Sequence, residues 1–132
     1  MQIDRSKHVP YCGGTNKAGT KVYIDKDLPT KLKVGNKTIN PIPYIALHEQ
    51  TEKPLMDKGM SYDAAHLQAT KTERKAVESN GINWDQYQNA LKPFIHKDEH
   101  EGNKDEPKDL ETKPYIDSKQ RYLLSKTLKG GS

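Results

Sequence analysis

Apolar residues in the middle of the chain recur every three or four positions, in two stripes separated by a break at Lys58-Gly59. Residues at this spacing lie on one side of a helix, so each stripe predicts an amphipathic helix. Both stripes include a histidine and a glutamate among their apolar members. The first stripe is Ile45, His48, Glu52 and Leu55/Met56, and the second is Tyr62, His66, Ala69, Glu73 and Ala76/Val77.

Start and stop signals indicate three helices. The first is expected from residue 43 or 44 to residue 52, and Pro54 either ends it there or kinks it into one extra turn. The second is expected over residues 62–79, where strong helix formers follow a serine N-cap and precede an Asn-Gly stop. A third helix opens at Asn83 and is bent or stopped by Pro93.

The first 43 residues carry the strand signals. β-Branched and aromatic residues dominate residues 21–25, and Gly35-Asn36 supplies the positive φ that a tight hairpin requires. Strands are therefore expected over residues 7–11, 21–25, 31–34 and 37–39, with residues 1–6 frayed and residues 12–20 forming a turn and a loop.

Together these elements predict an α+β fold in one domain over residues 1–95, with a small N-terminal antiparallel sheet packed on about three helices. The helices cover one face of the sheet, because the strands have too few apolar residues to be buried on both faces. Between residues 96 and 112, Leu110 is the one apolar residue. Such a segment buries too little surface to offset its ordering entropy, so residues 96–132 are predicted to form a charged, largely disordered and mobile tail.

Composition limits the size of the core and the class of protein. Hydrophobic residues make up 32% of the 132 residues and the mean hydropathy is −1.02, so the core must be small. The single cysteine, Cys12, excludes an internal disulfide framework and fits a reducing compartment. No apolar run approaches the roughly 20 residues that span a bilayer. We therefore expect a cytoplasmic protein without a membrane segment.

The positive charge is concentrated near the N-terminus. The net charge is +4, and residues 1–43 hold eight Lys/Arg against three Asp. A lysine-rich surface attracts nucleic acid, but the clustered arginines and interleaved aromatic residues of a dedicated nucleic-acid reader are missing. We expect a solvated, lysine-rich sheet face that makes weak, non-specific nucleic-acid contacts at most.

Four ionisable side chains on the inner faces of two adjacent helices need a common explanation, because burying such a group without a partner is costly. A shared divalent metal is the simplest one. His48 and Glu52 are one helical turn apart, as are the two ligands that an HExxH helix offers to zinc. With a carboxylate in place of the second histidine, Zn²⁺ remains the first choice, and Mn²⁺ or Fe²⁺ are alternatives.

Each of these residues receives a predicted role. His48, Glu52 and His66 are the expected metal ligands, and Glu73 is either a fourth ligand or a partner that orients His66. Glu49 is the expected general base. The alternative is that the four inward residues form a buried network of ion pairs and hydrogen bonds without a metal.

Other histidines are weaker candidates for a site. His8 and Cys12 are four residues apart on a segment that leads from a strand into a turn, and we interpret this pair as incidental. His96 and His100 lie in the charged stretch and are interpreted as surface residues.

Several short motifs lie between residues 20 and 116. They are Val22-Tyr23-Ile24-Asp25 with Leu28-Pro29, His48-Glu49-Gln50-x-Glu52, Ala65-His66-x-x-Ala69, Gly81-Ile82 and Lys113-Pro114-Tyr115. This pattern resembles a group of short uncharacterised proteins of phages and prophages, and the resemblance implies a phage context rather than a reaction. The helix motif alone is similar to that of zincin metallopeptidases, from which it departs at Glu52.

The sequence thus supports two functions from different classes. One is a phage-encoded, metal-dependent hydrolase of a minimal zincin-like type. Its substrate is unknown, and a peptide or a protein is the first candidate. The other is a non-enzymatic phage accessory or virion protein, in which a structural metal or an ion-pair network stabilises a small core and the partner is a phage or host protein. The expected location is the cytoplasm of the host cell or the virion.

Overall fold

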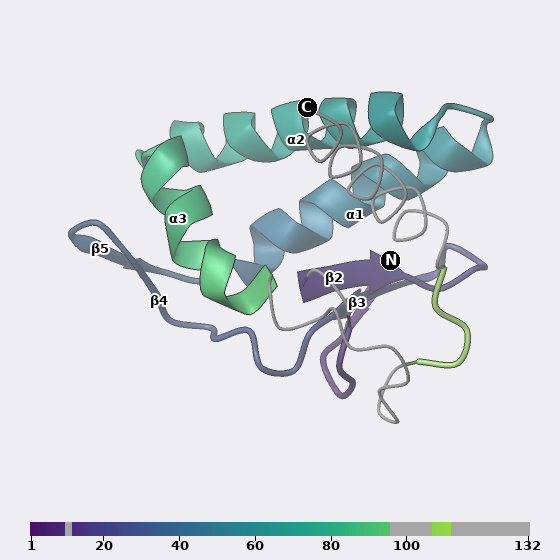
Figure 1. The fold of residues 1–132 in the computed structure, drawn as a ribbon, viewed down its shortest axis with the longest axis horizontal. Coiled ribbons are helices and arrows are strands. Elements are labelled where there is room, and N and C mark those ends of the chain that lie inside the picture. Colours follow the sequence, from purple (N-terminus) through teal and green to yellow (C-terminus); the bar gives the residue numbers. More distant parts are fainter. Residues whose placement is uncertain (10–11, 96–106, 112–132) are drawn as a thin grey trace, which may run out of the picture.

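A computed structural model describes residues 1–9, 12–95 and 107–111 of this chain. Its strands are β1 (Gln2–Asp4), β2 (Gly13–Thr15), β3 (Lys21–Ile24), β4 (Leu32–Val34) and β5 (Lys37–Ile39). The helices that follow are α1 (Ile42–Asp57), α2 (Tyr62–Ser79) and α3 (Trp84–Ile95), as Figure 1 shows. Short strands followed by three helices make an α+β fold, as the sequence predicts.

The strands form two separate sheets. In the three-stranded sheet the order is β1-β3-β2, with β1 parallel and β2 antiparallel to β3. The predicted hairpin is confirmed: β4 and β5 pair antiparallel around Gly35, whose φ is +58°. Because β1 runs parallel to β3, the larger sheet is mixed and not purely antiparallel.

Two of the three strands of the larger sheet lie where the sequence predicts none. β1 falls in the segment expected to be frayed and β2 in the segment expected to be a loop, whereas Lys7–Val9 is not a strand. Pro10 and Tyr11 lie outside the described residues. β2 is Gly-Gly-Thr, a sequence with little strand propensity, and yet all three of its residues are buried.

Close packing of α1 explains why glycine occupies β2. A Cβ atom on Gly13 would lie 2.9 Å from the Cγ2 atom of Ile45 and 3.4 Å from the carbonyl oxygen of Tyr23. Glycine thus lets α1 lie directly on the sheet. The strand is selected by this contact and not by the local preference of its residues.

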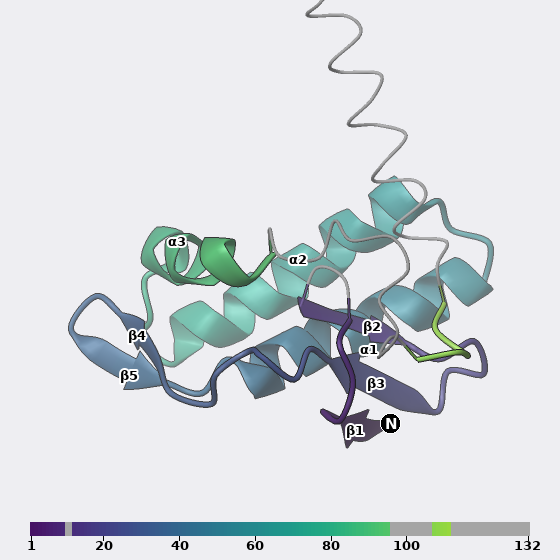
Figure 2. The same ribbon diagram turned by 60° about the horizontal axis from the view of Figure 1, so that its bottom comes forward.

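The helices form two layers above the sheet. α1 packs against β2 and β3 on one side and against α2 on the other, while α3 contacts α2 and β4 (Figures 1 and 2). The main core brings together apolar side chains from β3, β4 and all three helices, including Val22, Ile24, Ile45, Val77 and Tyr87. Only α1 therefore separates α2 from the sheet, and the inner faces of α1 and α2 meet each other.

Of the two effects expected of each proline, ending the helix or bending it, Pro54 and Pro93 do not end their helices. α1 continues through Pro54 to Asp57, and α3 continues through Pro93 to Ile95. Pro54 is exposed, and the turn that contains it is held by Met56, which packs with Tyr62 and Ala65 of α2. Tertiary packing thus outweighs the hydrogen bond that proline removes.

The N-terminal signal of α2 is confirmed. Ser61 accepts a hydrogen bond on its side chain from the backbone N–H of Ala64, as an N-cap does. The helix ends at Ser79, before Asn80 and Gly81.

Part of the predicted tail packs on the sheet. Residues 107–111 run beside the end of β2, where Lys17 N donates to Asp109 O and Glu111 N donates to Thr15 O, both at 2.8 Å. Leu110 pairs with Asn16 in an antiparallel bridge. The prediction of a mobile tail is therefore wrong for this segment, and residues 96–106 and 112–132 lie outside the described part of the chain.

Side chains reinforce this contact. Leu110 is 2% exposed and packs with Val9 and Tyr23, whose hydroxyl donates to Asp109 at 2.6 Å. The buried Lys53 of α1 forms ion pairs with Asp57 at 2.6 Å and with Glu111 at 3.4 Å.

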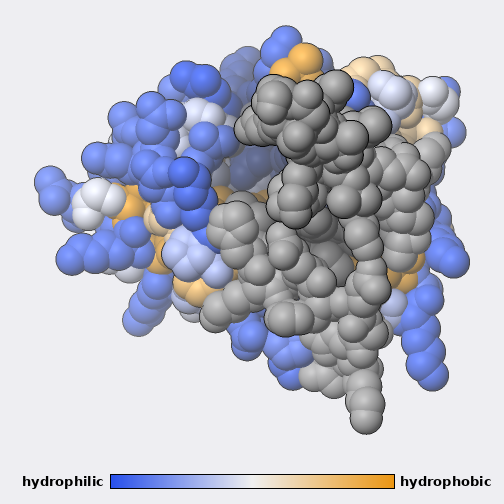
Figure 3. All heavy atoms as spheres, in the orientation of Figure 1, coloured by the Kyte–Doolittle hydropathy of each residue, from blue (hydrophilic) through white to orange (hydrophobic). Residues whose placement is uncertain are grey.

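Hydrophilic residues cover most of the coloured surface in Figure 3, and hydrophobic ones form only small separate areas. Among the described residues, the large hydrophobic side chains that remain exposed are Met1, Ile3, Met60 and Leu67. This distribution agrees with the small core that the composition predicts.

We expect the substitution Leu110→Ala to lower the free energy of unfolding by about 2–5 kcal/mol, because it leaves a cavity between Val9 and Tyr23. Urea denaturation of the full chain measures the change. The control is Leu67→Ala on α2, which removes a side chain that is 57% exposed and should change stability by less than about 0.5 kcal/mol. Equal effects of the two substitutions would contradict the packing of residues 107–111.

Candidate functional site

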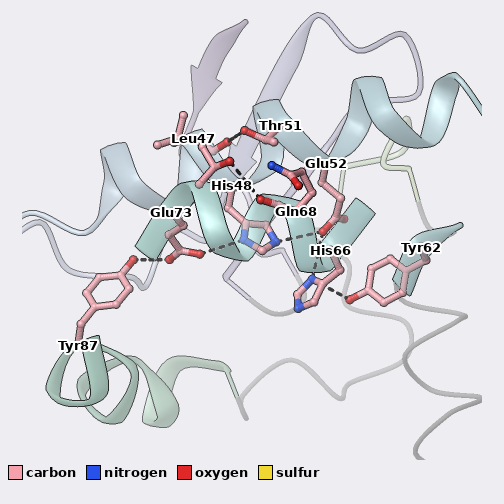
Figure 4. A network of polar contacts seen from close by, with 10 residues as sticks. Leu47, His48, Thr51, Glu52, Tyr62, His66, Gln68, Glu73 and Tyr87 are labelled. Atoms are coloured by element: carbon pink, nitrogen blue, oxygen red, sulfur yellow. Dashed lines mark hydrogen bonds and ion pairs between the residues drawn. The ribbon is translucent and has the colours of Figure 1, made fainter. Parts of the chain in front are cut away.

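His48 lies at the centre of a polar network that connects the three helices (Figure 4). Its ring extends from α1 toward α2, and both ring nitrogens meet carboxylates. Nδ1 lies 2.9 Å from Oε1 of Glu73, and Nε2 lies 3.0 Å from Oε2 of Glu52, one helical turn further along α1. The side chain of His48 is 12% exposed and those of the two glutamates are 8% and 5% exposed, so these contacts are largely shielded from water.

The network extends to α3 through Glu73. The Tyr87 hydroxyl donates a hydrogen bond of 2.6 Å to Oε2 of Glu73, so each oxygen of this carboxylate has its own partner. Tyr87 is fully buried, stacked on Trp84 and edge-on to Tyr44. These ring contacts fix the hydroxyl, which in turn fixes the carboxylate that holds His48.

In the other direction the network extends to the surface. Oε2 of Glu52 also lies 3.2 Å from Nδ1 of His66, and the Tyr62 hydroxyl lies 3.2 Å from the same nitrogen. The rings of His48 and His66 are edge-on, with centroids 4.9 Å apart. The side chain of His66 is 44% exposed, so this end of the network is open to solvent.

Electrostatics in the network favour charge on His48 and Glu52. Burial opposes the imidazolium form, but the hydrogen bonds of Glu52 and Glu73 outweigh it and raise the pKa of His48 to about 10. Burial likewise disfavours the carboxylate of Glu52, yet its bonds to His48 and His66 lower the pKa of Glu52. In the absence of a metal, His48 is therefore a cation between two carboxylates.

Glu49 has the opposite character. Among the residues that the structure describes, none donates a hydrogen bond to its carboxylate, which is buried although the residue as a whole is partly exposed. Removal from water and the nearby charges of Glu52 and Glu73 raise the pKa of Glu49, although His48 opposes the rise. A carboxylate of raised pKa without a fixed partner is suited to accept a proton near neutral pH.

A cavity of about 410 Å³ lies against the network. His48, Glu49, Glu52 and His66 line it on the side of α1 and α2, and the backbone of β2 and one side of α3 line it elsewhere. Its volume is in the range of small-molecule sites, about 300–1,000 Å³.

Three of the predicted metal ligands can meet one ion. One ligand atom each from His48, Glu52 and His66 lies within 4.8 Å of the others. Ligand atoms at about 2.0–2.1 Å from a tetrahedral ion are about 3.3 Å apart, which is close to the 3.0 and 3.2 Å that separate the Glu52 oxygen from the two histidine nitrogens. These residues therefore fit a divalent metal.

Glu73 does not belong to this group of three. It bonds the far nitrogen of His48, in the manner of the carboxylates that orient metal-bound histidines. Of the two roles predicted for it, the geometry fits that of an orienting partner, and the residue it orients is His48 and not His66.

Sequence reasoning missed the two tyrosines at the ends of the network. Tyr62 belongs to the apolar stripe predicted for α2 and Tyr87 lies on the apolar side of α3, and both rings are buried as these positions indicate. Each hydroxyl nevertheless needs a polar partner when it is buried. That requirement was the available signal, but it does not say which residue the partner is.

Among the weaker histidine candidates, His8 is the one that the structure describes, and it lies outside this site. His8 lies 3.2 Å from Asp25 and 3.5 Å from Asp27, whereas Cys12 is buried in the main core. His8, Asp25 and Asp27 are close enough to share an ion, but Asp25 already accepts hydrogen bonds from the backbone of Val9 and Asp27. His96 and His100 lie outside the described residues.

Comparison of this chain with protein families, with curated proteins and with solved structures finds no match. Within the described part of the chain, no helix combines the length and apolar character needed to cross a bilayer.

In the presence of a chelator, we expect the free energy of unfolding to fall between about pH 7 and pH 9. The raised pKa of His48, about 10 against 6.5 for the unfolded chain, stabilises the fold fully below pH 6.5, and this stabilisation is lost as the pH rises toward 10. The raised pKa of Glu49 acts in the same direction. His48 alone should give a slope that approaches about 1.4 kcal/mol per pH unit, and Glu49 adds to it at the lower end of this range.

Urea denaturation at several pH values measures this slope. His48→Gln keeps a polar side chain without a titrating ring, and its stability should vary much less with pH. A wild-type slope of zero or of the opposite sign would show that His48 is not a cation in the metal-free fold.

Proposed function

We propose that this protein is a metal-dependent hydrolase, in which His48, Glu52 and His66 hold a divalent ion. Zn²⁺ is the first candidate for this ion. The observation that carries the proposal is the position of Glu49. Its carboxylate borders the same cavity as the three ligands, with a raised pKa and no hydrogen-bond donor among the described residues. A structural ion would not require such a base beside it.

The roles of the chain's own residues follow from their contacts. Glu49 accepts the proton of a water molecule that attacks the carbonyl carbon of an amide or ester, and then passes it to the departing amine or alcohol. An ion held by His48, Glu52 and His66 would supply the polarisation of the carbonyl and would lower the pKa of the water. The water oxygen first adds to the carbonyl carbon, and the bond from that carbon to the leaving group then breaks as the carbonyl re-forms, so hydrolysis consumes one water and needs no other reactant.

Glu73 and Tyr87 prepare His48 for its role. A neutral histidine that donates Nδ1–H to Glu73 presents the lone pair of Nε2 to the ion. Tyr87 holds Glu73 in the orientation that this bond requires.

A specific observation favours a second candidate function. Both nitrogens of His48 already bond carboxylates, so the network is complete as an ion-pair cluster without a metal. Under this reading the protein is a non-enzymatic phage accessory or virion protein that acts by binding a phage or host protein, and the cluster stabilises a small core.

The first test is metal binding by full-length protein purified without a histidine tag. We expect about one equivalent of Zn²⁺ by elemental analysis, and a gain in stability of roughly 2.7 kcal/mol at a hundredfold excess over the dissociation constant. His48→Ala and His66→Ala should each abolish the binding, while His8→Ala is the control that retains it. A chelator-insensitive melt without bound metal, even after addition of Zn²⁺ or Mn²⁺, would favour the ion-pair cluster.

The second test separates catalysis from structure. Glu49→Gln should keep the metal and reduce hydrolysis of a library of dye-quenched peptides by at least about a hundredfold, because it removes the base alone. Glu78→Gln is the matched control, since Glu78 is an exposed residue that pairs with Arg74. Metal-loaded wild-type protein without activity on peptides or simple esters would contradict the hydrolase proposal and leave a structural metal.

A further inference from the structure

α3 provides no ligand to the proposed metal, yet one side of it borders the cavity. Trp84, Tyr87, Gln88, Leu91 and Lys92 line the cavity, at the spacing of residues on one helical face. The ligands project from α1 and α2. The cavity therefore has a reactive side and, on α3, a side that takes part in the proposed reaction only through Tyr87, which holds Glu73.

The inner part of this second side is apolar. Trp84 and Leu91 are 8% and 4% exposed, and Ile45 of α1 lines the cavity as well. Gln88 and Lys92 line it from exposed positions on α3. A group that enters past Gln88 thus meets apolar side chains at a depth where bulk water is excluded.

The cavity is larger than a metal-bound group alone requires. Its volume is about 410 Å³, whereas an apolar cavity of about 150 Å³ is enough to hold benzene. Space therefore remains for a ring or a branched side chain next to a bound carbonyl.

We propose that α3 is the substrate-recognition wall, and that the substrate is an amide or ester with a bulky apolar group on the acyl side of the bond to be cleaved. This inference rests on the proposed function, because it takes the ion and Glu49 as the reacting side. Burial of the apolar group against Trp84 and Leu91 stabilises the complex by removing apolar surface from water.

The test uses two hydroxamates, which chelate a protein-bound zinc ion and differ only in the apolar group that they carry. Acetohydroxamate and phenylacetohydroxamate are titrated calorimetrically into the zinc-loaded full chain. Because binding would remove the apolar surface of the phenyl group from water, we expect the phenyl compound to bind at least about tenfold more tightly.

A substitution at the cavity mouth locates the apolar group. Gln88→Trp places an indole at an exposed position that lines the cavity, and should reduce the preference for the phenyl compound to less than about threefold while acetohydroxamate binding changes little. Asn89→Trp is the matched control, since Asn89 is the exposed neighbour on α3 that does not line the cavity, and it should keep the full preference. Gln88→Phe provides a second variant with the same expectation.

The outcomes distinguish the two proposals. If zinc-loaded protein binds neither hydroxamate, the proposed function fails and this inference fails with it. If acetohydroxamate binds but the phenyl group adds nothing, the ion is accessible and the recognition wall is wrong. A preference that persists in both Gln88 variants would also overturn the inference, because the apolar group would then lie outside the cavity.

Discussion

The placement of His48 between two buried carboxylates constrains how the three helices can be arranged. Removing one partner of a buried ion pair costs about 3–5 kcal/mol, so α1 and α2 must meet with Glu52 on one side of the ring and Glu73 on the other. Glu73 in turn needs a partner for its second oxygen. Tyr87 supplies it, and α3 must therefore lie where that hydroxyl reaches. Gly13 completes the arrangement by letting α1 approach the sheet.

The helical part of the site could be predicted because its information is local. His48 and Glu52 are one turn apart on any helix, and His66 and Glu73 lie on the inner face of the next helix by periodicity alone. Two helices joined by a short turn also pack side by side as antiparallel neighbours, which brings their inner faces together. The identity of four inward-facing polar residues thus follows from spacing, without knowledge of the angle between the helices.

The remaining features depend on tertiary contacts that spacing does not encode. Glu73 contacts His48 instead of His66 because of the position of α2 along the axis of α1. No local signal in the sequence sets that position. β2 forms because α1 presses on Gly13, although Gly-Gly-Thr has little strand propensity. Leu110 is the one apolar residue of a charged stretch of the sequence, but in the fold it packs against Val9 and Tyr23. In each case the deciding partner is distant in the chain.

The same contacts that stabilise the metal-free network would also compete with a metal for His48. An ion that binds Nε2 of His48 must displace a proton held with a pKa of about 10, which at pH 7 weakens the apparent affinity by about a thousandfold relative to a fully deprotonated site. Ions with low intrinsic affinity for nitrogen and oxygen ligands cannot overcome such competition easily. Along the Irving–Williams series Mn²⁺ and Fe²⁺ are weaker than Zn²⁺. Because the proton competes equally with every ion, it leaves the order of these affinities unchanged and raises the intrinsic affinity that an ion needs in order to occupy the site.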